Sequence, residues 1–222
     1  MVIITGDSHG NPAKFKESGI PELSSSDKVI ILGGFGFDLR KSEAGAGPVL
    51  EALAGKKYDI LFIDGNEELT HAALNQYPVS SYCGGKIHKI SDGIIHLMRG
   101  QVYSIDGHSY FTFGGAASAD RFYQGDKWSK YELPSVEEYA EGMINLRRHG
   151  DKVDYILTHT APRHILAQLG HIPEAEELEL DDYLEWIWKT IEFEKWFFGH
   201  FHLDKKINPK ISAIWKNAVK IR

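Results

Sequence analysis

The sequence predicts an α/β protein with a parallel sheet covered by helices, and two observations support this class. Three short apolar runs rich in β-branched residues open the chain, at Val2–Thr5, Lys28–Leu32 and Asp59–Ile63, and glycine-containing turns follow each of them. Such runs are typical of buried strands. The segments between them, at 12–18 and 48–54, have the composition of helices. Strands that alternate with helices indicate βαβ units and a parallel sheet.

The rest of the chain predicts further strands and two more helices. The pair Asp106-Gly107 is a strong hairpin signal, so we expect an antiparallel meander of strands at 94–98, 101–105 and 109–113. Ser135 and Glu138 have capping-box spacing ahead of a helix at 135–149, and Gly150 is its stop. The remaining expected elements are a strand at 154–158, a helix at 181–191, and closing strands at 196–198, 205–208 and 211–215.

Length and composition favour one globular domain spanning residues 1–222. The chain contains 42% hydrophobic and 25% charged residues, which excludes a disordered or collagen-like protein. No internal repeat or linker is visible. The single cysteine, Cys83, has no partner for an internal disulfide, so we expect a reducing, cytoplasmic setting. The sequence starts without the pattern of a secretory signal and contains no apolar stretch of membrane-spanning length, so we expect no membrane partner.

The charge balance bears on the partners that the protein can bind. The 25 basic residues against 31 acidic ones give a formal net charge of −6. A broad nucleic-acid surface needs an excess of lysine and arginine, so this class of partner is not expected. A local basic cleft remains compatible with the composition. The oligomeric state cannot be read from the sequence.

Polar residues that can bind metals follow four of the expected strands. They are Asp7 and His9 after the first strand, Asn66 and Glu67 after the third, His159 after the strand at 154–158, and His200 and His202 after the strand at 196–198. The second strand is followed by glycines, including Gly34. Ligands of open α/β sheets collect at the carboxyl ends of strands. We therefore expect four of the 11 histidines at one location.

The spacing of these residues indicates a transition-metal site. Asp7 and His9 are two residues apart, as are His200 and His202, and an extended backbone would direct both members of a pair to the same side. Imidazole mixed with carboxylate and amide oxygen suits Mn, Fe or Zn. Taken singly, each motif is also explained by a turn or a hydrogen-bonded loop histidine. Their joint occurrence at successive strand ends is what favours a metal site.

As a set, the motifs resemble those of the calcineurin-like metallophosphoesterases, in a small bacterial and phage branch. The matching segments are GDSHG at 6–10, LGGFG at 32–36, GNEE at 65–68, LTHT at 157–160 and GHFH at 199–202. The resemblance implies a four-layer α/β/β/α sandwich with two metal ions between the sheets. It assigns Asp7, His9 and His202 to one metal, and Asn66, His159 and His200 to the other. It further implies hydrolysis of a small-molecule or nucleotide phosphomonoester or phosphodiester by metal-activated water.

Two positions depart from the family pattern at the centre of the chemistry. Gly34 stands where the family has the aspartate that bridges both metals, and Glu67 stands where it has a histidine that assists the leaving group. Two divalent ions repel strongly at a separation of ~3.5 Å, so we expect a weakened second metal site and reduced activity. Glu67 could replace the missing ligand as a catalytic residue or be a solvated helix residue, and both interpretations stay open. Asp38 and Asp64 are lesser candidates for the bridging role.

Three functions are compatible with this pattern. The first is an active metal-dependent phosphoesterase. The second is a degenerate family member that binds a metal or a phosphorylated ligand without turnover. The third is an inactivated variant of an active parent, in which restoring Asp at 34 and His at 67 would raise turnover. A positive group should also bind the phosphate, and the arginines considered for this role are Arg40, Arg99 and Arg121.

Overall fold

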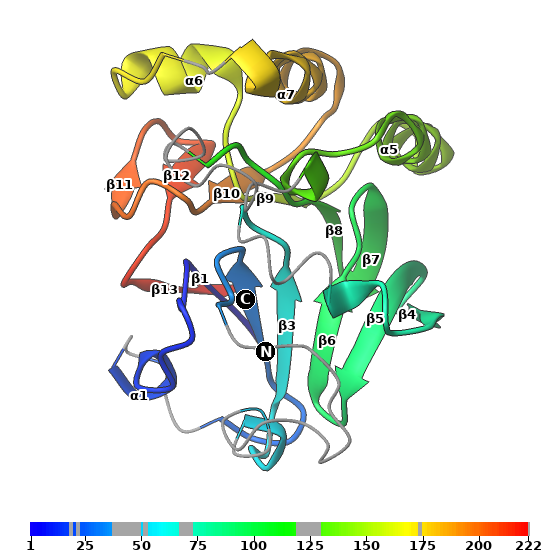
Figure 1. Cartoon of the computed structure of the whole chain (residues 1–222), viewed down its shortest axis with the longest axis vertical. Helices are drawn as coiled ribbons and strands as arrows, with labels where there is room; N and C mark the ends of the chain where they lie inside the picture. Colours follow the sequence, from blue (N-terminus) through cyan, green and yellow to red (C-terminus); the bar gives the residue numbers. More distant parts are fainter. Residues whose placement is uncertain are drawn as a thin grey trace.

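Two β-sheets lie face to face in this computed structural model, and helices cover their outer faces (Figure 1). The structure describes residues 1–17, 20, 23–36, 50, 53–66, 73–118, 130–172 and 175–221. In the expected helix at 12–18 it shows α1 at Lys14–Glu17, and in the one at 48–54 it shows helical residues 50, 53 and 54. The other residues of the second segment, and residue 18 of the first, lie outside the described residues.

The first sheet has seven strands and contains the predicted parallel core. Its order is β13-β1-β2-β3-β6-β5-β4, in which β1, β2, β3 and β6 run parallel. The register pairs Val2 with Lys28 and Lys28 with Asp59. The strands are β1 Val2–Thr5, β2 Lys28–Leu32, β3 Asp59–Ile63, β4 Val79–Tyr82, β5 Gly85–Ser91, β6 Ile94–Leu97 and β13 Ala218–Ile221.

The second sheet has six strands in the order β11-β12-β10-β9-β8-β7. Strands β8, β9, β10 and β12 run parallel, with β7 and β11 antiparallel at the two edges. The strands are β7 Gln101–Ile105, β8 His108–Phe113, β9 Tyr155–Thr158, β10 Lys195–Phe198, β11 Lys205–Lys206 and β12 Ile211–Ala213. The predicted closing strands are therefore present, although β11 and β12 are shorter than expected.

The predicted three-strand meander is wrong in one respect. Strand β6 belongs to the first sheet and runs parallel to β3, whereas β7 and β8 form a hairpin in the second sheet. All four residues of β6 are buried, as is typical of a strand covered on both faces. The chain crosses between the sheets at Arg99-Gly100. The predicted hairpin turn at Asp106-Gly107 is confirmed, and both residues have positive φ angles, 50° and 84°.

Alternating side chains build three apolar layers between the four layers of secondary structure. In β1, Ile3 packs outward among helical residues, whereas Val2 and Ile4 face the second sheet. In β9, Ile156 packs outward against the other helices, whereas Tyr155 and Leu157 face the first sheet. This period of two is the geometry of a strand buried on both faces. The expected α/β/β/α sandwich is therefore confirmed as the fold class.

The helices on the second sheet are α5 Val136–Arg148, α6 Arg163–Gln168 and α7 Leu178–Thr190, with short 3-10 turns η2 at Lys130–Glu132 and η3 at Ala175–Glu177. The capping box of α5 is confirmed, because Ser135 and Glu138 satisfy each other's backbone N–H groups. Figure 1 shows α6 and α7 at the top of the molecule and α1 at the opposite end. No helix among the described residues combines the length and the apolar character that crossing a membrane requires.

Candidate metal centre

Asp7, His9 and His202 bring three metal-binding atoms together from two different sheets. Asp7 and His9 follow β1, and His202 follows β10. Oδ2 of Asp7 lies 3.7 Å from Nε2 of His9 and 3.8 Å from Nε2 of His202, and the two Nε2 atoms are 2.8 Å apart. All three ligand atoms lie within 4.8 Å of one another. One cation with bonds of about 2.0–2.2 Å fits between donors at these separations.

The backbone of the two histidine loops is turned, and the extended pairs expected from the sequence are wrong. His9, His200 and His202 have φ angles of 46°, 67° and 49°. They are three of the six non-glycine residues with positive φ in the described part of the chain. This conformation is costly for residues with a Cβ and concentrates at functional sites. It is held at His9 by a hydrogen bond from the His9 N–H to the carbonyl oxygen of Gly34, 2.8 Å.

A second group joins Asn66 to His159. Nδ1 of His159 lies 2.7 Å from the carbonyl oxygen of Leu32 and donates to it, so a neutral ring has its lone pair on Nε2. Nε2 lies 3.1 Å from Oδ1 of Asn66. Asn66 is oriented by Ser118, whose Oγ accepts from Nδ2 and donates to the Asn66 carbonyl oxygen. With the ring in that neutral form, two lone pairs face each other, and a shared cation would satisfy both.

His200 links this second group to Asp7. Its ring centroid lies 4.8 Å from that of His159, and its backbone N–H donates to Oδ1 of Asp7 over 3.1 Å. Burial and the neighbouring His159 lower the pKa of His200 to about 3, so the ring is neutral and able to bind a metal. Burial alone would raise the pKa of Asp7, but His159, His202 and the His200 N–H together lower it to about 2. Asp7 is thus an ionised carboxylate between the two groups.

Glycines make the close approach of these side chains sterically feasible. Gly34 has a φ of 54°, and a Cβ built on it would overlap the carboxylate of Asp7. A Cβ on Gly33 would overlap the imidazole of His159. The missing side chain of Gly34 therefore leaves room for the carboxylate of Asp7.

Several residues considered from the sequence do not join these groups. Glu67, Asp38, Arg40 and Arg121 lie outside the described residues. Asp64 is engaged elsewhere, since its two carboxylate oxygens contact Arg99 and His96. Arg99 is buried and also contacts Glu138, so it cannot reach a phosphate at Asp7 without breaking these bonds. The bridging role for Asp64 and the phosphate-binding role for Arg99 therefore find no support in this geometry.

A cavity of about 390 Å³ opens beside Asp7 and His9 and contains two lysines, Lys14 and Lys216. Lys14 is only 9% exposed, and its Nζ donates to the Trp215 carbonyl oxygen. Burial lowers the pKa of Lys14, and Asp7 opposes that shift. The Trp215 ring stacks on His202 at 5.3 Å, and Nζ of Lys216 lies 4.3 Å from the Trp215 ring centroid.

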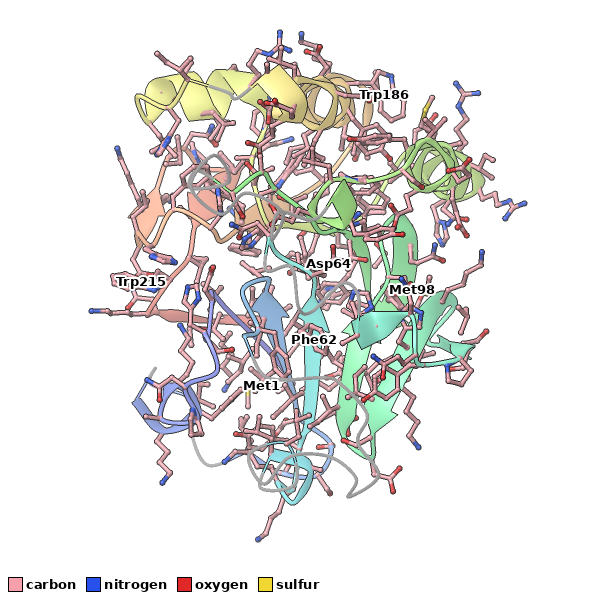
Figure 2. The ribbon with its side chains drawn as sticks, in the orientation of Figure 1. Met1, Phe62, Asp64, Met98, Trp186 and Trp215 are labelled. Atoms are coloured by element: carbon pink, nitrogen blue, oxygen red, sulfur yellow. The ribbon has the colours of Figure 1, made fainter. Side chains whose placement is uncertain are left out.

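The sequence motifs do not predict these lysines, since the phosphate ligands expected from the sequence are arginines. Lys14 follows the first motif by a few residues but belongs to no motif itself. Lys216 is more than 200 residues away along the chain and reaches the cavity only because β13 pairs with β1. Figure 2 shows Trp215 at the left side of the molecule, close to β13, and Asp64 at the end of β3.

No protein-family model matches the chain, and no curated protein matches it. One similar solved structure is described as "Putative 5'-Nucleotidase from Staphylococcus aureus in complex with alpha-ketoglutarate". It is 15% identical, with a TM-score of 0.49, over 96% of this chain and 48% of that chain. The chain thus spans about half the length of that protein.

Proposed function

We propose that the protein is a metal-dependent phosphoesterase of the calcineurin-like type that hydrolyses a small phosphomonoester or phosphodiester. The observation that carries the proposal is the group of Asp7, His9 and His202, whose ligand atoms lie within 4.8 Å of one another. It lies beside a cavity that contains two lysines. The positive groups favour an anionic substrate, and the donors favour Mn, Fe or Zn.

The residues of the centre divide into two ligand groups. Asp7, His9 and His202 would hold one metal, and Asn66, His159 and His200 would hold the other. A divalent ion bound here supplies Lewis acidity and neutralises negative charge on a phosphoryl group. Asp7 contacts both ligand groups, one through each carboxylate oxygen. Among the described carboxylates it is therefore the best placed to bind both metals.

The residues of the adjoining cavity would bind and orient the substrate. Lys14 and Lys216 supply ammonium donors for phosphate oxygens, and Asn11 adds an amide. The side chains of His9 and His202 are 48% and 46% exposed, so a substrate can reach the first ligand group from solvent. Burial of Lys14 strengthens its interaction with an anion, because less water screens the charge.

The second ligand group is expected to bind metal more weakly than the first. Asn66, His159 and His200 are neutral ligands, and Gly34 adds no carboxylate. Two divalent ions would then share the single negative charge of Asp7 among the described ligands. Glu67 remains our candidate for the missing carboxylate or for a catalytic group.

A protein that binds one metal and a phosphorylated ligand without turnover is the alternative function. The position of Gly34 favours it, because a bridging carboxylate is missing there. We also retain two expectations from the sequence: one domain over residues 1–222, and a reducing, cytoplasmic setting based on Cys83. Cys83 is exposed and free in the structure.

Metal analysis beside a phosphatase assay tests the proposal. We expect purified protein to bind Mn²⁺ and to hydrolyse an aryl phosphate when Mn²⁺ is added. His202→Ala should lower both metal content and turnover, whereas His149→Ala, at the exposed end of α5, should change neither. Metal binding without turnover would favour the binding protein. Equal effects of the two substitutions would contradict the assignment of the site.

A further inference from the structure

The ring of His202 is held in the first ligand group without the hydrogen bond that usually orients a metal-binding histidine. Its Nε2 faces Asp7 and His9, and among the described residues no hydrogen bond reaches its Nδ1. Histidine ligands ordinarily donate the second ring N–H to a carboxylate or carbonyl oxygen, which fixes the ring. The His202 side chain is also 46% exposed. A different contact is therefore needed to keep the ring directed at the metal position.

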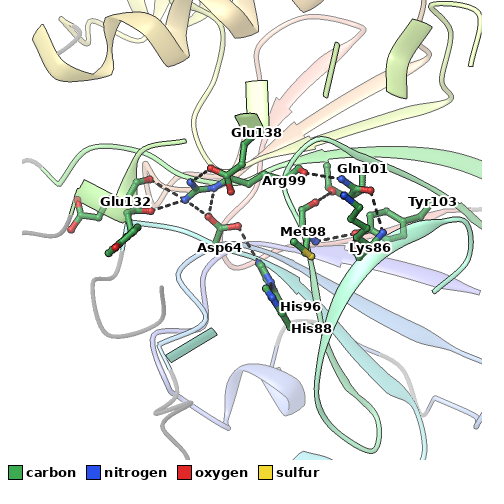
Figure 3. Close-up of polar contacts among 12 residues, drawn as sticks. Asp64, Lys86, His88, His96, Met98, Arg99, Gln101, Tyr103, Glu132 and Glu138 are labelled. Carbon is green, nitrogen blue, oxygen red and sulfur yellow. Dashed lines mark hydrogen bonds and ion pairs between the residues drawn. The ribbon is translucent and has the colours of Figure 1, made fainter. Parts of the chain in front are cut away.

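The second ligand group shows the usual arrangement. Nδ1 of His159 donates to the carbonyl oxygen of Leu32 over 2.7 Å. Asn66 follows Asp64 by two residues, and Figure 3 shows Asp64 beside Arg99, whose Nε donates to it over 2.6 Å. Asp64 and Arg99 are both buried. Buried polar contacts thus fix the histidine of this group and the start of the loop that contains its asparagine.

An aromatic ring, that of Trp215, contacts the ring of His202. The two centroids are 5.3 Å apart and the planes differ by 16°, which is an offset stack. Trp215 is half-buried and contributes to the cavity of about 390 Å³ beside Asp7. Rotation of the imidazole away from the metal position would break the stack. The stack can therefore orient His202 as a hydrogen bond to Nδ1 orients other histidine ligands.

One carboxylate fixes the backbone that carries Trp215. Asp204 follows His202 by two residues, and its oxygens accept the backbone N–H groups of residues 215, 216 and 217 over 2.9, 3.0 and 3.1 Å. Hydrogen bonds to an ionised acceptor are stronger than those between neutral groups. The loop of His202 and the turn at 215–217 are therefore tied together by a single side chain.

The same turn also contacts the first sheet and the proposed substrate cavity. Thr5, at the end of β1, donates from Oγ1 to the carbonyl oxygen of Asn217 over 3.0 Å. Nζ of Lys14 donates to the carbonyl oxygen of Trp215. Lys14 contributes to the cavity beside Asp7. One turn thus contacts a metal ligand through its ring and a lysine of the cavity through its backbone.

We propose that Trp215 is a positioning residue of the metal centre, whose ring holds the imidazole of His202 in the orientation that binds the metal, and that Asp204 holds the turn of Trp215. Neither residue belongs to the two ligand groups, so a substitution of either should weaken metal binding without removing a ligand. The role rests on the proposed function for its place in hydrolysis, whereas its effect on metal binding does not depend on turnover.

Mn²⁺ titration of the full chain tests the role of the ring. Trp215→Leu keeps an apolar side chain but removes the ring, and we expect about tenfold weaker binding, the lower end of the range for residues that orient metal ligands. Trp215→Phe keeps an aromatic face and should bind nearly as tightly as wild type. Calorimetry and the EPR signal of free Mn²⁺ give the affinities, and urea unfolding without metal measures stability separately. Affinities that are equal in the Phe and Leu variants, whether high or low, would overturn the proposal.

A double-mutant cycle tests the role of Asp204. Asp204→Ala should weaken Mn²⁺ binding, and adding Trp215→Leu should lower it little further, because both changes act through the same stack. Fully additive losses would contradict this link. Asp154→Ala is the matched control, because Asp154 also accepts a backbone N–H, from Ser109, but precedes β9 and lies at the end of that strand away from His159. The control should bind Mn²⁺ as wild type does, and an equal loss there would overturn the proposal.

The two proposals can fail separately. Mn²⁺ binding that depends on the ring of Trp215, in a protein that does not hydrolyse aryl phosphate, would contradict only the proposed function. Hydrolysis by wild type, with the same Mn²⁺ affinity in Trp215→Leu, would overturn only the positioning role. In an active protein, saturating Mn²⁺ should restore turnover to Trp215→Leu but not to His202→Ala, because only the second variant lacks a ligand. A wild type that binds no Mn²⁺ would overturn both proposals.

Discussion

At Gly34, one missing side chain determines how closely Asp7 can approach the second ligand group. A Cβ at this position would overlap the Asp7 carboxylate, and the φ of 54° is unfavourable for other residues. An aspartate at position 34 would therefore lower the stability of the fold, which the sequence pattern alone does not indicate. The carboxylate that it would add must displace the one already present.

We predict that Gly34→Asp alone destabilises the protein and fails to raise turnover. A non-glycine residue in the left-handed region costs about 1–2 kcal/mol, and the overlap with Asp7 adds to this. Denaturant unfolding and an aryl phosphate assay measure the two effects. Gly34→Ala is the control, because it carries the strain without the carboxylate. A Gly34→Asp variant that is as stable as wild type and more active would contradict this prediction, because Asp7 would then have to move aside at no cost in stability.

Lys14 provides a second prediction at the scale of the residue. Lys14→Met keeps much of the side-chain volume but removes the charge beside Asp7. We expect KM for an anionic substrate to rise about tenfold, which corresponds to roughly 1.4 kcal/mol. Steady-state kinetics at several salt concentrations measure it. Lys152 forms an exposed ion pair with Glu192, so the control variant Lys152→Met should leave KM unchanged. If both substitutions changed KM to a similar extent, the prediction that Lys14 binds the substrate would be wrong.

The sequence was informative for the site where strand ends coincide with polar motifs. It predicted that Asp7, His9, His159, His200 and His202 gather at one place, because parallel strands align their carboxyl ends. It could not show the positive φ angles of the loops, which follow from contacts such as that between His9 and Gly34. Nor could it show Lys216, which reaches the cavity through a long-range strand pairing.

At the scale of the element, strands were easier to predict than the sheet to which each belongs. β1, β2 and β3 match their predicted bounds because their apolar runs are bounded by glycine turns. β6 was assigned to the wrong sheet because a short turn at Arg99-Gly100 looks like a hairpin although the chain changes sheets there. β4 was not predicted, since its side chains are mostly exposed and lack an apolar pattern.

Helix α7 contains a buried acid that should make stability depend on pH. Asp181 is 0% exposed, and neither carboxylate oxygen has a hydrogen-bond partner among the described residues. Burial, with a contribution from Glu177, raises the pKa of Asp181 from 3.8 to about 7, and Arg163 opposes the shift. The folded state therefore favours the protonated acid. This contribution to stability is fully present below pH 3.8 and is lost as the pH rises through about 7.

We predict that Asp181→Asn removes this dependence. The variant should match wild type near pH 3.5 and exceed its unfolding free energy by at most about 4 kcal/mol above pH 7. Urea unfolding over this pH range gives the difference between the two proteins. Asp151→Asn, at an exposed carboxylate outside α7, is the control. A constant difference between Asp181→Asn and wild type at all pH values would contradict the raised pKa.

At the scale of the whole molecule, the candidate centre lies where the two sheets meet. Asp7 and His9 come from the first sheet and His202 from the second, and the apolar layer containing Ile4 and Leu157 joins the sheets beneath them. The first and last strands also pair, which places the two termini close together (Figure 1). The sequence indicated the layers through strand alternation. The order of the strands depends on long-range pairing, which local patterns do not encode.

A metal held by residues of both sheets should stabilise the whole fold. A ligand that binds only the folded state raises the free energy of unfolding by about 2.7 kcal/mol when its concentration is 100 times its Kd. In a protein of this size that corresponds to a rise in Tm of about 5–10 °C. We therefore predict that Mn²⁺ raises Tm by this amount and that EDTA reverses the change, as measured by calorimetry. His9→Ala and His202→Ala should each abolish the rise because each removes a ligand from one sheet, whereas His149→Ala should keep it. If His202→Ala showed the same rise as wild type, the metal would bind elsewhere, and the assignment of the centre to both sheets would be wrong.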